Sequence, residues 1–160
     1  PCGYGLPSIV GAKIGCPDTP VVGFAGDGAF GIAVTELTAI CRSEWPAITM
    51  VVFRNYQWGA EKRNSTLWYD DNFVGTELDD GVSYAGIARA CGLQGVQAKT
   101  MEELTAVLNK AIDDQMNHGK TTLIEALINQ ELGEPFRRDA MKKPVAVAGI
   151  SKADMRPQKV

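Results

Sequence analysis

The stretch Val21-Val22-Gly23-Phe24-Ala25-Gly26-Asp27-Gly28-Ala29-Phe30 decides the fold of this chain. Its first five residues are apolar or small and follow Pro20, so they predict a short buried strand that ends at Gly26. Asp27 should then lie at the carboxyl end of that strand, where we expect it to face solvent. Gly26 and Gly28 flank it and have no Cβ atoms, so a phosphate could approach the main-chain N–H groups closely.

A second apolar run, Ile48-Thr49-Met50-Val51-Val52-Phe53, predicts another strand, which ends at Arg54-Asn55. Between the two runs, residues 32–42 carry apolar side chains at helical spacing. A strand–helix–strand crossover is right-handed and makes the two strands parallel in nearly all cases, so both should end at the same edge of the sheet. Mg²⁺ prefers oxygen ligands and takes few of them from the protein. We therefore expect Asp27 and Asn55 to meet across one cation.

The rest of the chain continues the alternation of helices and strands. Residues 81–90 predict a helix that stops before Gly92, and Thr100-Met101-Glu102-Glu103 has the form of a capping box at the start of another helix. Residues 123–128 predict a further strand. The fold class is therefore α/β, with a mainly parallel sheet flanked by helices on both faces. The only histidine, His118, should lie at a helix C-terminus or on the surface.

The segment between Tyr56 and Asp80 is long for a connection, and such segments tend to be functional or flexible. We interpret the four aromatic residues of this segment as packing residues and not as cofactor contacts; they are Trp58, Trp68, Tyr69 and Phe73.

The composition excludes several classes of protein. The chain has 160 residues, 45% of them hydrophobic, and a net charge of −3, which gives no basic footprint for nucleic acid. No apolar stretch approaches membrane-spanning length, and no secretory signal is recognisable. The cysteines are scattered without a paired spacing, which favours reduced thiols and a cytoplasmic setting; they are Cys2, Cys16, Cys41 and Cys91.

Residues 133–160 form a basic tail, with seven Lys or Arg against three Asp or Glu, after an acidic domain spanning residues 1–132. The simpler interpretation is a solvated segment that docks on the acidic surface. The alternative is that Arg137 or Arg138 reaches an anionic substrate, because a guanidinium group suits sulfonate or phosphate.

Gly26-Asp27-Gly28, followed by a crossover and Asn55, resembles the metal and diphosphate motif of thiamine diphosphate (ThDP) enzymes, in the branch that contains acetolactate synthase and the 2-oxo acid decarboxylases. Residues 2–13 also resemble the opening of that family's diphosphate-binding domain. The resemblance implies a ThDP-binding fold with ThDP and Mg²⁺ as cofactors. It implies that the metal ligands are Asp27, the Asn55 side chain and the Gln57 main-chain carbonyl. The cofactor-binding set that it implies is Gly26, Asp27, Gly28, Ala29, Phe30, Asn55, Gln57 and Trp58.

Residues 55–64 and 133–145 resemble a narrower branch of acetyltransferases, which convert sulfoacetaldehyde and phosphate into sulfite and acetyl phosphate. This resemblance implies that the chain is the carboxyl-terminal piece of a longer protein that forms a homodimer or homotetramer. The glutamate that activates ThDP should come from a pyrimidine-binding domain of another subunit, because no glutamate in this chain matches it, and the piece alone should be inactive. Two alternatives stay open: an acetolactate synthase or 2-oxo acid decarboxylase of the same fold, and a noncatalytic diphosphate-binding module.

Overall fold

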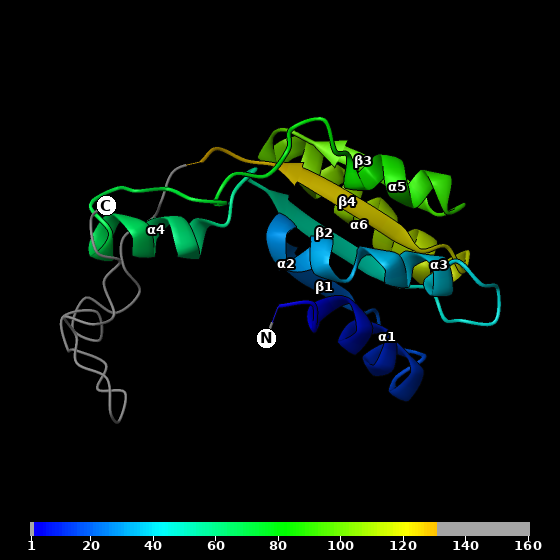
Figure 1. The fold of residues 1–160 in the computed structure, drawn as a ribbon. Helices are drawn as coiled ribbons and strands as arrows, with labels where there is room; N and C mark the ends of the chain where they lie inside the picture. The colour runs from blue at the N-terminus through cyan, green and yellow to red at the C-terminus, as the bar shows by residue number, and fades with distance from the viewer. Residues whose placement is uncertain (1, 131–160) are drawn as a thin grey trace, which may run out of the picture.

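The computed structural model describes residues 2–130 (Figure 1). Its helices and strands alternate along the chain, with one 3₁₀ turn at Val34–Glu36. In order, they are α1 (Gly5–Gly15), β1 (Val22–Gly26), α2 (Asp27–Ile32), α3 (Leu37–Ile40), β2 (Thr49–Arg54), α4 (Gly59–Trp68), α5 (Tyr84–Ala90), β3 (Gln94–Ala98), α6 (Met101–Asn117) and β4 (Thr122–Leu127).

The four strands form one parallel sheet in the order β1-β2-β4-β3. In the register, Ala25 of β1 lies beside Val52 of β2, so the two strands that the sequence predicts as parallel neighbours are confirmed as such. Strand β4 is also confirmed. The sequence analysis missed β3, because Gln94–Ala98 offers only one β-branched residue and no apolar run.

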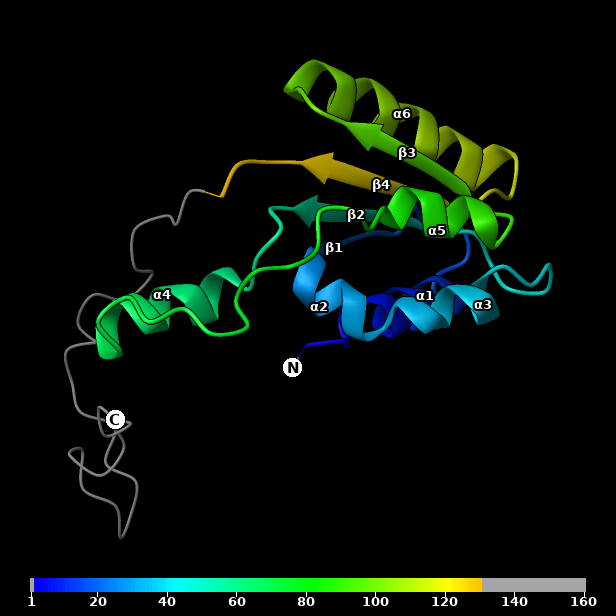
Figure 2. The ribbon, with the colours of Figure 1, turned by 45° about the horizontal axis from the view of Figure 1, so that its top comes forward.

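Helices cover both faces of the sheet, as the sequence predicts (Figure 2). On one face, α1, α2, α3 and α5 contribute to the larger core, whose buried residues include Leu6, Phe30, Leu37 and Ala88. On the other face, α6 packs its Leu104, Val107, Leu108 and Ala111 over β2, β3 and β4. Each cluster removes apolar surface from water on its own side of the sheet, and this burial is the main stabilising contribution to such a fold.

Several helices differ from the sequence prediction in position or extent. The helix predicted over 32–42 is instead α2, a 3₁₀ turn and α3, and it begins at Asp27. The segment 56–80, predicted as a connection, contains α4, which lies beyond the carboxyl ends of the strands and away from the two core layers (Figures 1 and 2). The packing interpretation was wrong for Tyr69 and Phe73, which are exposed.

The Thr100 cap of α6 is confirmed, although Glu103 reaches back to the N–H of the residue before the cap and not to that of Thr100. The side chain of Thr100 accepts a hydrogen bond from the Glu103 N–H at 3.1 Å, and the Glu103 carboxylate accepts one from the Lys99 N–H at 2.7 Å. His118 is the residue that ends this helix, as predicted. Within residues 2–130, no helix combines the length and the apolar character needed to cross a bilayer.

Gly95 provides a test of how closely α5 packs on β3. A Cβ atom at this position would lie 2.0 Å from the Ala85 carbonyl oxygen, which belongs to the backbone and cannot rotate away. We therefore expect Gly95→Ala to destabilise the protein by about 3 kcal/mol or more, at the upper end for overpacking. Urea unfolding followed by circular dichroism measures this change.

Gly11→Ala is the matched control, because Gly11 lies inside α1 and a Cβ atom there would meet nothing within 4 Å. It should be neutral or stabilise by up to about 1 kcal/mol through helix propensity. Equal destabilisation by the two substitutions would contradict the proposed close approach.

Candidate metal and diphosphate site

The candidate site lies where β1 and β2 end. Asp27 follows β1 directly and is the first residue of α2, and its side chain is only 1% exposed. The expectation that Asp27 faces solvent was therefore wrong. The physical reason is Arg54, the last residue of β2, which is equally buried and forms an ion pair with Asp27 at 3.2 Å between Nη1 and Oδ2.

Backbone groups fix the orientation of the Asp27 carboxylate. Oδ2 accepts a hydrogen bond from the Tyr56 N–H at 2.7 Å in addition to the one from Arg54. Oδ1 accepts one from the Gly28 N–H at 2.9 Å. Two donors thus hold Oδ2, while Oδ1 keeps room for a further partner.

That free side of Oδ1 faces Asn55 and Gln57. One terminal atom of the Asn55 amide lies 3.1 Å from Asp27 Oδ1 and 3.1 Å from the Gln57 carbonyl oxygen. If this atom is the nitrogen, it donates to both oxygens. If it is the oxygen, three oxygen atoms face one another, an arrangement that a cation would stabilise. The structure therefore brings together the three metal ligands suggested by the sequence, as a donor set of hard oxygens that suits Mg²⁺.

The chain reaches this geometry through a turn at Tyr56, whose φ of 60° lies in the left-handed region. A non-glycine residue in this region is uncommon and is held there by its surroundings. The hydrogen bond from the Tyr56 N–H to Asp27 supplies part of that constraint. As a result, the Asn55 amide lies within 3.1 Å of both Asp27 Oδ1 and the Gln57 carbonyl oxygen.

The residues expected to contact the diphosphate lie in the first turn of α2 and directly before it. Gly26 is the residue before the helix, and the residues that follow Asp27 in the first turn are Gly28, Ala29 and Phe30. Their N–H groups lie at the positive end of the helix, which favours an anion, although the Gly28 N–H already donates to Asp27. The Phe30 ring is buried in the larger core, so only its main chain could contact a ligand.

Trp58 lies against the same turn. A Cβ atom on Gly28 would approach the Trp58 indole to 2.8 Å, so only glycine allows this contact. The ring therefore covers Gly28 from the α4 side, which places Trp58 beside the other residues of the expected cofactor-binding set. The main-chain N–H of Trp58 donates to the Thr76 carbonyl at 2.7 Å, which anchors the residue before α4.

Glu125 completes the site and was missed by the sequence analysis. It lies in the middle of β4, is 1% exposed, and places Oε1 3.6 Å from Arg54 Nε. Its carboxylate accepts hydrogen bonds from Ser83 Oγ, Gln97 Nε2 and the N–H groups of Tyr84 and Ala85. The sequence did carry a signal for this residue, because Glu125 interrupts the otherwise apolar run Leu123-Ile124-Glu125-Ala126-Leu127. A glutamate is rarely buried without a partner, so its place in a buried strand indicated that a partner for its charge should lie nearby.

Burial and hydrogen bonding act in opposite directions on Glu125. Burial raises the pKa of its carboxyl, but the hydrogen bonds from Gln97, Ser83 and the two backbone N–H groups outweigh it, so the pKa lies below its usual value. Burial also raises the pKa of Tyr84, whose hydroxyl donates to the Asp27 carbonyl at 3.0 Å. The Tyr84 ring meets Phe30 edge to face, with 5.1 Å between the ring centroids.

The lowered pKa of Glu125 predicts a pH dependence of stability. A depressed folded-state pKa stabilises the protein above the pKa of the unfolded chain, about 4.3, and this contribution disappears as the pH falls through the folded-state pKa. Glu125→Gln should therefore lower the unfolding free energy by about 1–3 kcal/mol at neutral pH. The difference from wild type should shrink in acid, as urea unfolding between neutral pH and pH 3 would measure.

Glu77→Gln is the control for this measurement, because Glu77 is exposed and pairs with Lys62 on the surface. It should change stability much less, since solvent screens such pairs. A Glu125→Gln penalty that stays constant down to acid pH would contradict the assigned role of the charge.

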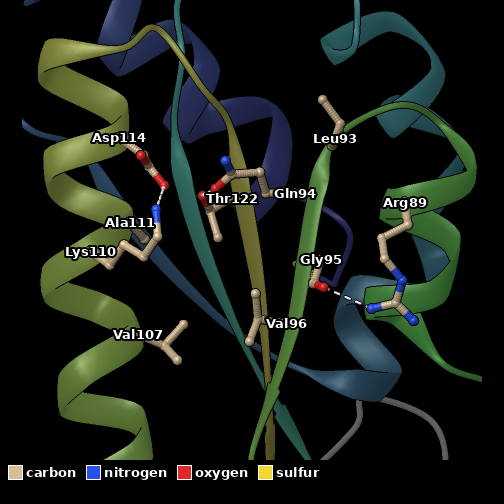
Figure 3. Close-up of a pocket in the computed structure, with 10 residues that line it drawn as sticks. All are labelled: Arg89, Leu93, Gln94, Gly95, Val96, Val107, Lys110, Ala111, Asp114 and Thr122. Atoms are coloured by element: carbon tan, nitrogen blue, oxygen red, sulfur yellow. Dashed lines mark hydrogen bonds and ion pairs between the residues drawn. The ribbon is translucent and has the colours of Figure 1, made fainter.

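A cavity of about 370 Å³ lies elsewhere, between α6 and the start of β3 (Figure 3). Its two cations are engaged, since Lys110 pairs with Asp114 at 2.5 Å and Arg89 donates to the Gly95 carbonyl at 2.7 Å. The cavity is lined by residues from the amino-terminal ends of β3 and β4, whereas Asp27 and Asn55 follow strand carboxyl ends, so it is separate from the candidate site. The tail with Arg137 and Arg138 lies outside the described residues.

Comparison with known proteins agrees with this geometry. Residues 1–126 match the family described as "Thiamine pyrophosphate enzyme, C-terminal TPP binding domain", thiamine pyrophosphate being another name for ThDP. The chain belongs to this family and contains its cofactor-binding domain.

Two curated relatives share most of its sequence. A sulfoacetaldehyde acetyltransferase of Rhodobacter capsulatus is 84% identical over 99% of this chain and 27% of its own length. One of Roseovarius nubinhibens is 81% identical over the whole chain and 26% of its own length. The chain thus spans about a quarter of these relatives. A solved ThDP-dependent 4-hydroxybenzoylformate decarboxylase of Rhodococcus jostii has a TM-score of 0.70 and 27% identity, covering 82% of this chain and 24% of the decarboxylase.

Proposed function

We propose that this chain is the diphosphate- and metal-binding part of a ThDP-dependent acetyltransferase that converts sulfoacetaldehyde and phosphate into acetyl phosphate and sulfite. The observation that carries the cofactor assignment is the convergence of Asp27 Oδ1, the Asn55 amide and the Gln57 carbonyl at the ends of β1 and β2. The substrate assignment is supported by the 84% identity to an enzyme of that name.

In this proposal, Asp27, Asn55 and Gln57 hold Mg²⁺ against the diphosphate of ThDP. Bound ThDP supplies the electron sink that the reaction requires. The first turn of α2, with the N–H groups of Ala29 and Phe30, lies beside the diphosphate, and Trp58 limits the access of water beside Gly28. These residues act as anchors, because none of them exchanges a proton with the substrate.

The remainder of the active site belongs to other parts of the protein. We propose that the glutamate that activates ThDP comes from a pyrimidine-binding domain of another subunit in a cytoplasmic homodimer or homotetramer. The basic tail, residues 133–160, extends the domain formed by residues 1–132. Arg137 or Arg138 could then serve as a binding residue for sulfonate or phosphate, with docking on the acidic domain as the alternative.

An acetolactate synthase or a 2-oxo acid decarboxylase is the second candidate. The likeness to the Rhodococcus decarboxylase favours it as far as the fold is concerned, because one fold can carry several ThDP reactions. The high identity to two acetyltransferases extends through the segment after Asn55 and favours the first candidate. A noncatalytic diphosphate-binding module would retain the same oxygens, so the reaction itself must be tested.

Asp27→Asn in the full-length enzyme tests the metal assignment. Asparagine keeps the shape of a side chain that is buried and paired with Arg54, so it perturbs the fold less than alanine would. We expect Mg²⁺-dependent ThDP binding to weaken by about ten- to a hundredfold, because a charged ligand is lost. Asn55→Ala removes a neutral ligand and should weaken binding less. Calorimetric titration of the apoenzyme with ThDP at fixed Mg²⁺ measures both.

Asp113→Asn is the control, because Asp113 is an exposed carboxylate near the end of α6. It should leave ThDP affinity unchanged. Unchanged affinity in the Asp27 variant would overturn the metal assignment.

The reaction has its own test. Incubated with ThDP, Mg²⁺, sulfoacetaldehyde and phosphate, the full-length enzyme should release sulfite and form acetyl phosphate in equal amounts. With pyruvate it should form little acetolactate. Colorimetric sulfite and hydroxamate assays follow the two products. Acetolactate formation without sulfite release would leave the ThDP assignment intact and overturn the substrate assignment.

A further inference from the structure

Arg54 is a buried cation between two buried carboxylates. Its guanidinium lies 3.2 Å from Asp27 Oδ2 through Nη1 and 3.6 Å from Glu125 Oε1 through Nε, and all three side chains are 1% exposed. The three groups come from α2, β2 and β4, so this cluster links the carboxyl ends of β1 and β2 to the middle of β4. Burying charges costs free energy unless they are paired and hydrogen-bonded, so a cluster in this position requires an explanation.

The remaining contacts of Arg54 leave the guanidinium little freedom. Nη2 donates to the Asp79 carbonyl at 2.5 Å and to the Val82 carbonyl at 3.0 Å. The group also packs on two aromatic rings, with 4.3 Å to the centroid of Tyr56 and 5.1 Å to that of Tyr84. A planar guanidinium can make all these contacts at once, whereas an ammonium group is a single point charge.

We propose that Arg54, supported by Glu125, is a positioning residue for the metal ligand Asp27. Arg54 and the Tyr56 N–H both bind Oδ2, which turns Oδ1 toward Asn55 and Gln57. This inference rests on the proposed function, because it assumes that Asp27 binds the cation. It adds that the orientation of Asp27 depends on Arg54, a residue that does not contact the metal.

Glu125 gives the cluster its charge balance. Two carboxylates share one guanidinium, so the net charge is −1 and Arg54 does not neutralise Asp27 alone. Four hydrogen bonds fix the Glu125 carboxylate at the start of α5. Glu125 therefore cannot move toward Asp27 and compete with it for the metal ion. The cluster as a whole therefore offers a net negative charge, which suits a site for Mg²⁺.

Arg54→Lys in the full-length enzyme tests the proposal. Lysine keeps the positive charge but cannot reach Asp27 while it also holds the carbonyls of Asp79 and Val82. We expect the dissociation constant of the metal, measured with Mn²⁺ by electron paramagnetic resonance in the presence of ThDP, to rise about ten- to a hundredfold. Calorimetry with Mg²⁺ should give the same ratio to wild type. These readouts are independent of turnover.

Lys13→Met is the matched control. Lys13 is also a buried cation, 3% exposed, and its Nζ donates to the carbonyls of Pro17 at 2.8 Å and Thr19 at 2.9 Å, at the other end of the sheet. Its loss should lower the unfolding temperature and leave metal affinity within about twofold of wild type. If Lys13→Met weakens metal binding as much as Arg54→Lys does, the effect is general destabilisation and the proposal is wrong.

The double variant Arg54→Gln/Glu125→Gln decides the case in which Arg54→Lys does not fold. It removes one charge of each sign and so conserves the net charge of the cluster. The proposal predicts weaker metal binding here too, because Asp27 loses the Nη1 donor. A simple electrostatic effect predicts little change in metal affinity, because the net charge of the cluster is conserved.

Unchanged or tighter metal binding in the variants of Arg54 would overturn the positioning role. If Asp27→Asn still weakens metal binding in the same assay, only this inference fails. If Asp27→Asn also leaves metal affinity unchanged, the proposed metal site itself is wrong.

Discussion

The contact between Asp27 and Arg54 is the interaction on which the rest of the site depends. It joins the end of β1 to the end of β2 inside the protein, and Glu125 extends it to β4. Buried charges of this kind are costly, and they persist only where hydrogen bonds satisfy most of the remaining donors and acceptors. Backbone N–H groups and carbonyls largely meet that requirement here, although Arg54 Nε has no hydrogen-bond partner in the part of the chain that the structure describes. The cluster therefore fixes where the Asp27 carboxylate can point.

Parallel strand topology explains why these groups meet at all. Strands β1, β2 and β4 end at one edge of the sheet, so residues that directly follow them are neighbours whatever their separation in sequence. Two local features refine that placement. Helix α2 begins at Asp27 without an intervening loop, and Tyr56 adopts a left-handed conformation that turns Asn55 and Gln57 toward the carboxylate. The result is a set of oxygens that suits a hard cation beside the positive end of a helix, which is the combination that a metal-bound diphosphate needs.

Membership of the thiamine pyrophosphate enzyme family identifies the cofactor that this domain binds, but it does not identify the substrate. The cofactor anchor that we propose uses main-chain groups and a few polar side chains, so it can be retained while the reaction changes. In this chain the anchor is built into the rigid sheet, whereas α4 and the exposed aromatic residues Tyr69 and Phe73 lie beyond it. A rigid anchor beside a more exposed segment is consistent with a division between cofactor binding, which this domain supplies, and substrate recognition, which we assign in part to other regions of the protein.

The sequence by itself determined the strands β1, β2 and β4, the parallel pairing of the first two, and the meeting of Asp27 with Asn55. These follow from apolar runs and from the handedness of crossovers, which are local or nearly local properties. Only the tertiary structure decided that Asp27 is buried, that Arg54 and Glu125 bind around it, and that Gln94–Ala98 forms the edge strand β3. The physical reason is that burial and ion pairing depend on which distant segments pack together. Asp27, Arg54 and Glu125 lie far apart along the chain, and no periodicity within any one segment encodes their contact.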